Sequence, residues 1–124
     1  MPPVDVLLFK ENDGTVPVAD WLKGLESKAQ DKCYVGMERL GELGYELRRP
    51  QADYLRDGIY ELRIRYRRLN HRLLYFFFGD TAVVVSHGLT KEDRIPDVDI
   101  DRAVDRKRKF KHDPESHTFV WEGR

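Results

Sequence analysis

The chain has 124 residues, of which 40% are hydrophobic, and its 22 basic and 22 acidic side chains give a formal net charge of zero at pH 7. This length suits one domain with a real core, and the neutral total excludes a protein that binds nucleic acid through bulk charge alone. A single cysteine excludes an intrachain disulfide, and no apolar run approaches the roughly 20 residues of a membrane helix, so we expect a cytoplasmic protein with one domain over residues 1–124.

The first predicted elements are a short strand and a helical region. Residues 4–9, VDVLLF, have the composition of a strand, and Asp13-Gly14 supplies a turn after it. Pro17 suits the first position of a helix. Apolar residues then recur three and four positions apart, which is typical of one helical face: Val18, Leu22, Leu25, Ala29, Cys33, Met37 and Leu40.

A capping signal inside this apolar stripe divides it into two helices. The segment SKAQ fits a capping box, with Ser27 as the N-cap and Gln30 three residues later. Gly44 suits the end of a helix. We therefore expect helices at about residues 17–25 and 28–43, followed by a connection over residues 45–57 in which Pro50 prevents the helix from continuing.

Three strands are predicted next. In residues 59–68 apolar and charged side chains alternate. One face of this strand carries Tyr60, Leu62, Ile64 and Tyr66, and the other carries Glu61, Arg63, Arg65 and Arg67. Residues 71–78 and 81–87 are apolar on both faces, as central strands are, and Gly79-Asp80 forms a turn between them. The short connections predict a mostly antiparallel meander.

Pro96 begins the last predicted element, a helix that Asp97 or Asp99 is expected to cap and that runs to about residue 111. The tail, residues 112–124, has weak periodicity, but we expect it to dock through Phe119, Val120 and Trp121. The predicted fold is α+β, in the order β-αα-βββ-α, with a mostly antiparallel sheet, an N-terminal helical hairpin on one face and a C-terminal helix.

Positive charge is concentrated in residues 46–72, which hold eight arginines and no lysine against four acidic residues. The planar guanidinium of arginine matches the geometry of phosphate. The arginines also have an ordinary explanation, as a solvated strand face or as partners of acids such as Glu61. Arg72 differs because it begins a central strand beside Leu74 and Phe76, where a guanidinium needs an anion or a specific partner.

His87 and Lys91 lie at the end of the last predicted strand and just beyond it. Taken singly, each has an ordinary explanation, as a structural histidine and as a solvated loop lysine. Antiparallel pairing could nevertheless bring Arg63, Arg72, His87 and Lys91 to one end or face of the sheet. Such a cluster would bind a phosphodiester and stabilise the charge that develops on it during cleavage.

The remaining polar groups predict no further chemistry. His112 and His117 have a spacing unsuited to zinc, and Cys33 lies on the apolar helical face, so we expect neither a metal nor a cofactor. The basic end of DRAVDRKRKFK is better explained as a solvated helix C-terminus than as an RNA contact.

The segment LRDGIYELRIRYRRLNHRLLYFFFGDTAVVVSHGLTKE and the later DIDRAVDRKRKF resemble the RelE/ParE superfamily of type II toxin–antitoxin toxins, and more closely its phage-derived HigB-like branch. Those toxins typically read L-x-D-G-x-Y-E-L-R, then Y-R-x-L-Y-F, then a strand that ends H-G-F-x-K-K, then a basic helix after a proline. The helical pair and the first strand also fit, so the resemblance covers about residues 4–111 and leaves residues 112–124 as a tail. Leu89 replaces the usual aromatic residue, and Glu92, followed by Asp93, replaces the second lysine.

The resemblance implies an endoribonuclease (mRNA interferase) that cleaves mRNA on translating ribosomes, inhibits translation and is neutralised by a helix-turn-helix antitoxin. Cleavage would proceed without metal, by attack of the ribose 2′-hydroxyl on the adjacent phosphate. Carried over by position, the catalytic candidates are two arginines that hold the phosphate, a histidine that acts as general acid or base, and a lysine that supports the transition state: Arg63, Arg72, His87 and Lys91. The RNA-binding candidates are Arg65, Arg67 and Arg68.

Two alternatives remain open at this point. One is a ParE-like toxin of the same fold that acts on gyrase, in which the basic residues serve protein contacts. The other is a catalytically decayed partner-binding module, which the acidic pair Glu92-Asp93 favours. The presence of both His87 and Lys91 favours the nuclease over the gyrase-directed toxin.

Overall fold

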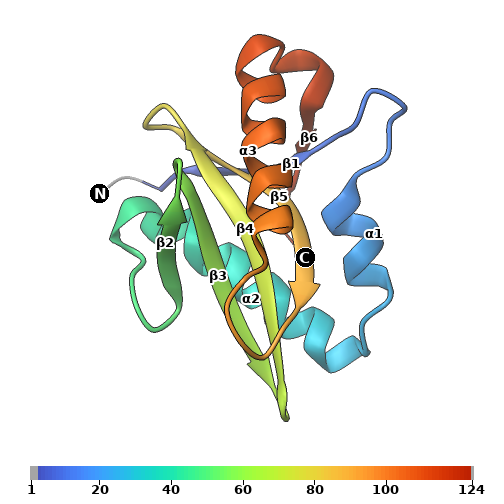
Figure 1. Ribbon diagram of the computed structural model, residues 1–124, viewed down its shortest axis with the longest axis vertical. Helices are drawn as coiled ribbons and strands as arrows, with labels where there is room; N and C mark the ends of the chain where they lie inside the picture. Colours follow the sequence, from blue (N-terminus) through green and yellow to red (C-terminus); the bar gives the residue numbers. More distant parts are fainter. Residues whose placement is uncertain (1–2, 124) are drawn as a thin grey trace.

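The computed structural model describes residues 3–123, which form one six-stranded sheet with helices on both of its faces (Figure 1). The strand order is β2-β3-β4-β5-β1-β6; β1 and β5 are parallel, and all other neighbours are antiparallel. The predicted α+β class is confirmed. In chain order the elements are β1 (Asp5–Phe9), α1 (Pro17–Lys23), α2 (Ser27–Leu43), the short 3-10 helix η1 (Gly44–Glu46), β2 (Ala52–Arg56), β3 (Ile59–Tyr66), β4 (Leu69–Phe78), β5 (Ala82–Thr90), α3 (Asp97–His112), η2 (Glu115–His117) and β6 (Thr118–Val120).

The sheet separates two hydrophobic cores. The apolar stripe of α1 and α2 packs on one face, against side chains such as Leu62, Leu73 and Val85, so the predicted helical hairpin is confirmed. On the opposite face α3 contributes Ile100, Ala103 and Phe110, which pack on other side chains of the same strands. Because β4 and β5 carry apolar residues on both faces, they can serve both cores at once. Within residues 3–123, no helix is long and apolar enough to cross a membrane.

Both predicted N-caps are wrong. Ser27 is the first residue of α2, Glu26 occupies the N-cap position, and no side chain caps the helix. The amide Nε2 of Gln30 instead donates a hydrogen bond to the carbonyl oxygen of Leu22 at 2.9 Å, so it ties α2 to α1. In α3 the N-cap position belongs to Pro96, which has no polar side chain to offer. Gly44, by contrast, ends α2 with a positive φ of 53°, as predicted.

Two short strands were not predicted, and both lie at edges of the sheet. Strand β2 falls in the predicted connection and pairs with β3. Strand β6 comes from the tail and pairs with β1. The expected docking of the tail is confirmed, since Trp121 also stacks on Tyr34 with ring centroids 6.2 Å apart. With three residues, β6 is too short to show a period of two in the sequence.

An irregularity in the pairing of β4 and β5 determines which face His87 occupies. Leu74 is opposite His87, whereas the next residue, Tyr75, is opposite Val85, so Ser86 is an extra residue in a β-bulge. Without the bulge, strict alternation from Val85 would turn His87 toward α1 and α2. The bulge places it on the face of Leu74, which is the face that α3 covers.

Candidate functional site

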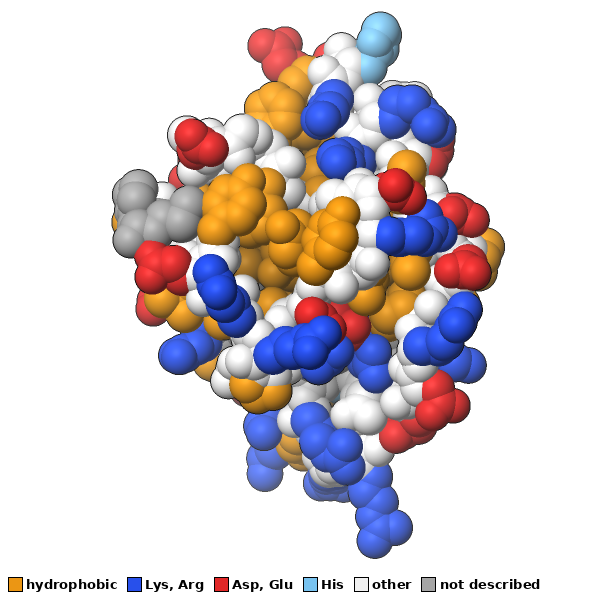
Figure 2. Space-filling view, turned by 60° about the vertical axis from the view of Figure 1, so that its left-hand side comes forward, with side chains coloured by type: hydrophobic (Ala, Val, Ile, Leu, Met, Phe, Trp, Pro, Cys, Tyr) orange, Lys and Arg blue, Asp and Glu red, His pale blue; other side chains and the backbone are white. Residues whose placement is uncertain are grey.

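Part of the face under α3 stays open, where β2, β3 and the first half of β4 extend beyond the helix (Figure 1). Two adjoining hollows lie there, with volumes of about 530 and 390 Å³, and Arg63 and Arg72 line both. We call them together the arginine groove. Other polar side chains that line it are Gln51, Tyr54, Arg56, Glu61, Arg65, Asn70, Asp93, Arg94 and Asp97. Figure 2 shows basic side chains gathered over the lower half of one side of the molecule, around a small acidic patch.

The register of β3 and β4 brings the groove arginines together. Arg63 and Arg72 are direct cross-strand partners, and Arg65 is opposite Asn70 one step further along the same face. Opposite residues of an antiparallel pair lie on the same face of the sheet. The predicted alternation is therefore confirmed from Tyr60 to Tyr66.

Arg72 has a specific partner inside the protein. Its Nη1 lies 2.8 Å from Oε1 of Glu61, and the two side chains are only 10% and 5% exposed. Its Nη2 donates to the backbone carbonyls of Glu92 and Asp93, at 3.3 and 3.1 Å. Of the two possibilities that the sequence left open, an external anion or an internal partner, the structure contains the internal partner.

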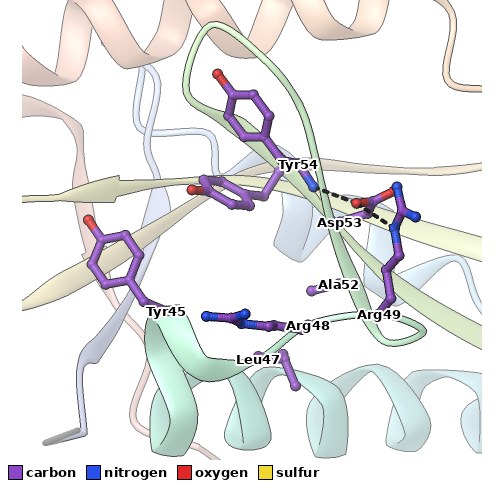
Figure 3. Close-up of a pocket in the computed structure, with 8 residues that line it drawn as sticks. Tyr45, Leu47, Arg48, Arg49, Ala52, Asp53 and Tyr54 are labelled. Atoms are coloured by element: carbon purple, nitrogen blue, oxygen red, sulfur yellow. Dashed lines mark hydrogen bonds and ion pairs between the residues drawn. The ribbon is translucent and has the colours of Figure 1, made fainter.

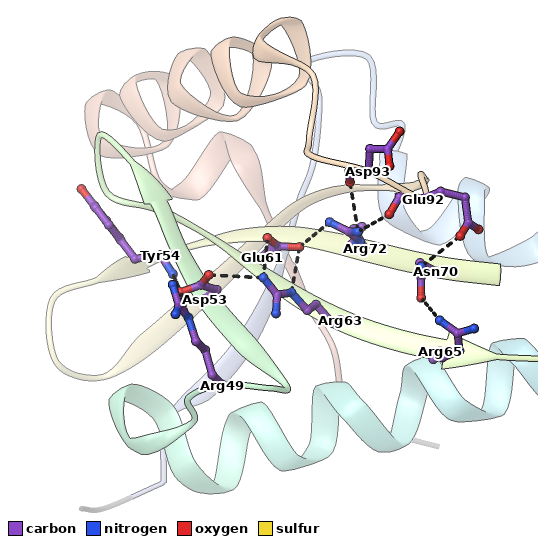
Figure 4. A network of polar contacts seen from close by, with 10 residues as sticks. All are labelled: Arg49, Asp53, Tyr54, Glu61, Arg63, Arg65, Asn70, Arg72, Glu92 and Asp93. Atoms are coloured by element: carbon purple, nitrogen blue, oxygen red, sulfur yellow. Dashed lines mark hydrogen bonds and ion pairs between the residues drawn. The ribbon is translucent and has the colours of Figure 1, made fainter. Parts of the chain in front are cut away.

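Arg63 is the more accessible of the two, with 40% of its side chain exposed. Its guanidinium lies 3.2 Å from Oδ2 of Asp53 and 3.4 Å from Oε1 of Glu61. Asp53 also forms an ion pair with Arg49, whose Nε lies 2.9 Å from Oδ1 of Asp53. The hydrogen bond from Arg49 holds the pKa of Asp53 below its usual value. The result is a row of alternating charges, Arg49–Asp53–Arg63–Glu61–Arg72, which crosses from β2 to β4 (Figure 4). With three guanidiniums and two carboxylates, the row retains one positive charge.

His87 lies outside the residues that line the groove. Its Nδ1 is 2.8 Å from Oγ of Ser86, and its Nε2 is 3.1 Å from Oδ1 of Asp99 in α3. Arg106 donates to Ser86 Oγ at 3.4 Å, so the Ser86 hydroxyl is free to donate to Nδ1 while Nε2–H donates to the carboxylate. In this arrangement a neutral His87 fastens the start of α3 to β5.

Burial lowers the pKa of His87 to about 4 from its usual 6.5, despite the opposing effect of Asp99. Between pH 6.5 and 4 the unfolded chain therefore binds a proton that the folded chain does not, so stability falls as the pH falls. We expect His87 to account for a loss on the order of 3 kcal/mol across this window. Urea unfolding at a series of pH values should show a flatter dependence for His87→Gln than for the parent. Burial also lowers the pKa of His71, but the parent and His87→Gln both contain His71, so its contribution cancels in the comparison. Curves of stability against pH that run parallel for the two proteins would contradict the prediction.

Lys91 and Arg65 lie at the outer end of the groove face. The backbone nitrogen of Lys91 donates to the carbonyl of Asn70 at 3.0 Å, which continues the pairing of β4 and β5 by one residue. Lys91 is exposed, and its side chain is not among those that line the groove. Arg65 lines the groove and donates to the side chain of Asn70 at 3.1 Å. Asn70 in turn donates to the Glu92 carboxylate at 3.2 Å.

Arg67 does not lie on the groove face. Strand β3 ends at Tyr66, and Arg67 begins the two-residue turn with a positive φ of 56°, so the alternation stops one residue too early to include it. Its guanidinium lies 3.5 Å from the Glu26 carboxylate, next to the start of α2, and over the ring of Tyr66. Arg68 is exposed in the same turn. The structure thus brings Arg63, Arg65 and Arg72 together and separates Arg67 from them.

The importance of two acidic residues, and of the strand that carries one of them, is evident only in the structure. The sequence indicates Glu61 only as a possible partner of an arginine, whereas in the structure it is the buried carboxylate that both Arg63 and Arg72 contact. Its position on the arginine face of the alternation was the available signal. Asp53 belongs to β2, whose existence was not predicted, so nothing in the sequence placed it beside Arg63.

One comparison with known proteins places the chain in a family. A family model described as "Phage derived protein Gp49-like (DUF891)" matches residues 20–108, well over half of the chain. The matched span contains all residues of the arginine groove, together with His87 and Lys91. No curated protein matches the chain at a significant level.

Proposed function

The chain belongs to the Gp49-like family of phage-derived proteins, a toxin–antitoxin toxin-like (RelE/ParE-like) family, and on this premise we propose that it is a HigB-like, ribosome-dependent mRNA endonuclease of the cytoplasm. Family membership implies an antitoxin partner in general. We propose that this partner is a helix-turn-helix protein. The observation that carries the nuclease proposal is the arginine groove, an open hollow on the sheet in which Arg63, Arg65 and Arg72 occupy adjacent rows of one face.

In the proposed reaction, a phosphate of single-stranded mRNA enters the groove and contacts Arg63, whose exposed side chain can turn from Asp53 toward it. Arg72 lies behind it and keeps Glu61 in place. The ribose 2′-hydroxyl attacks the adjacent phosphorus, the bond to the 5′-oxygen breaks, and the products are a 2′,3′-cyclic phosphate and a 5′-hydroxyl. Fixed positive charge at the phosphate stabilises the transition state without a metal.

The proton transfers can be assigned to groups near the groove. Of the carboxylates that line the groove, Glu61, Asp93 and Asp97, we assign this role to Glu61 because it lies 3.4 Å from Arg63: it accepts the proton of the 2′-hydroxyl, and the leaving 5′-oxygen takes a proton from water. Lys91, exposed at the end of β5, adds positive charge as the RNA binds. His87, with both ring nitrogens bonded to Ser86 and Asp99, contributes by holding α3 at the border of the groove.

The test is inducible expression followed by mapping of mRNA 5′ ends. We expect growth arrest and new 5′ ends within translated reading frames, because the ribosome presents the RNA to a protein whose net charge is zero. A reporter copy whose start codon has been removed should show none of these ends. DNA damage without new mRNA ends would point to the gyrase-directed alternative and contradict the nuclease.

A second candidate function is supported by the same row of charges. Arg72 is neutralised by Glu61, and Arg63 is shared between Glu61 and Asp53, so the groove arginines are already paired within the protein. This arrangement fits a partner-binding module without catalysis. Expression that neither arrests growth nor changes mRNA ends would favour it.

A further inference from the structure

A third hollow lies on the other side of β2 from the groove. It has a volume of about 560 Å³, and the side chains that matter here are Tyr45, Tyr54, Tyr60, Arg48 and Arg49 (Figure 3). We call it the tyrosine pocket. The proposed reaction at the arginine groove uses none of these five residues, although Arg49 ends the row of charges that crosses β2.

Two of the tyrosine rings are exposed in a way that suits stacking. Tyr45 lies flat on Phe77, with ring centroids 3.6 Å apart and an angle of 14°, yet it is 41% exposed, so one ring face is covered and the other is open. Tyr54 is 53% exposed and packs its ring at a steep angle against Tyr60, with centroids 5.1 Å apart. Rigid, half-exposed aromatic rings are the platforms on which unpaired bases stack.

The charge of the pocket favours an anionic ligand. Arg48 extends across the pocket toward Tyr45 (Figure 3), and within residues 3–123 no carboxylate forms an ion pair with it. Arg49 is paired with Asp53, which among residues 3–123 is the only acidic residue of the lining. Asp53 is also paired with Arg63, so its charge is already balanced. The guanidinium of Arg48 is therefore available for a phosphate.

The pocket is continuous with the arginine groove. Tyr54 lines the tyrosine pocket and the larger hollow of the groove, and Asp53, in the same strand, reaches Arg63 on the groove side. Strand β2 is the edge of the sheet, so in the part of the chain that the structure describes no further strand covers the path between them. Figure 2 shows an apolar patch bordered by basic side chains on this side of the molecule.

We propose that the tyrosine pocket binds single-stranded RNA, with an unpaired base stacked on Tyr45 or Tyr54 and its phosphate on Arg48. We take this RNA to be the mRNA strand of the proposed reaction, with an adjacent phosphate in the arginine groove. Only this choice of ligand rests on the proposed function. The pocket thereby holds nucleotides beside the reacting one and orients the strand. A peptide partner is less favoured because the lining has no unpaired acid to bind its basic groups.

The test is direct binding of a short, fluorescein-labelled single-stranded RNA of mixed sequence to the purified chain, measured by fluorescence anisotropy. Tyr45→Leu removes the stacking face but keeps apolar contact with Phe77, and we expect it to weaken binding roughly tenfold. Arg48→Glu reverses the charge beside that ring, and we expect a loss at least as large. Circular dichroism should show both variants folded, since both residues are exposed.

Two matched controls separate the pocket from general surface effects. Arg39→Glu makes the same charge change at an exposed arginine of α2 that lies outside the pocket lining, and Phe119→Leu removes an exposed ring of β6. Both should bind RNA like the parent. Equal losses in controls and pocket variants, or no loss in either, would overturn the proposal. So would RNA binding that is unchanged while Tyr45→Leu and Arg48→Glu lose the antitoxin, because the pocket would then be a protein-binding surface.

This measurement is independent of cleavage. If the protein binds RNA through Tyr45 and Arg48 but leaves mRNA intact in cells, the result would support the RNA site and contradict the nuclease proposal. If the parent protein cleaves mRNA and Arg48→Glu binds RNA as tightly as the parent, the result would support the nuclease proposal and contradict the RNA site.

Discussion

Arg63→Ala should lower the rate of mRNA cleavage about a hundredfold or more while the protein remains folded. Arg63 is the exposed member of the cross-strand pair Arg63–Arg72, and loss of a fixed donor that stabilises transition-state charge typically has an effect of roughly this size. The fold should survive because the side chain is 40% exposed and its carboxylate partners keep Arg49 and Arg72. Primer extension on an induced reporter measures the rate, and circular dichroism checks the fold.

Arg67→Ala is the informative control for this experiment. The alternation of residues 59–68 placed Arg67 on the same face as Arg63, whereas the structure pairs it with Glu26 next to the start of α2. We expect Arg67→Ala to cleave nearly as well as the parent. A variant as inactive as Arg63→Ala would show that the whole arginine-rich hairpin contacts RNA, and full activity of Arg63→Ala would remove the groove from the mechanism.

Arg72→Ala should lower the free energy of unfolding by about 3 kcal/mol, because truncation leaves the buried carboxylate of Glu61 without its closest partner. Removal of one member of a buried ion pair costs about 3–5 kcal/mol, and the lower end is expected here since Arg63 remains 3.4 Å from Glu61. The carbonyls of Glu92 and Asp93 lose a donor as well. Urea unfolding of the parent and the variant measures the difference.

A double-mutant cycle separates this ion pair from simple loss of packing. In the Glu61→Gln background the carboxylate charge is already absent, so Arg72→Ala should cost at least about 1 kcal/mol less than in the parent. Arg65→Ala is the matched surface control, because within the described residues its guanidinium bonds only the Asn70 side chain, and its effect should stay within about 0.5 kcal/mol. Equal costs of Arg72→Ala in both backgrounds would contradict a stabilising pair. Reduced cleavage in Arg72→Ala is interpretable only at temperatures where the variant is folded.

Periodicity in the sequence was sufficient for the long elements. The apolar stripe from Val18 to Leu40 predicted two helices on one face of the sheet. The segments that form β4 and β5 are apolar on both faces, and this pattern predicted the centre of the sheet. These predictions succeeded because burial imposes a repeat on every long element that packs against a core. The two N-cap predictions were wrong because a single residue decides each N-cap, and the chain uses Gln30 and Asp99 for contacts between elements instead.

By itself, the sequence determined the fold class, the face of Arg63, Arg65 and Arg72, and the need of Arg72 for a partner. Only the tertiary structure decided that this partner is Glu61, that β2 brings Asp53 to Arg63, and that a bulge at Ser86 turns His87 toward Asp99. The physical reason is the range of the interactions. Alternation is a property of neighbouring residues, whereas register, bulges and ion pairs depend on segments that meet only after the sheet has assembled.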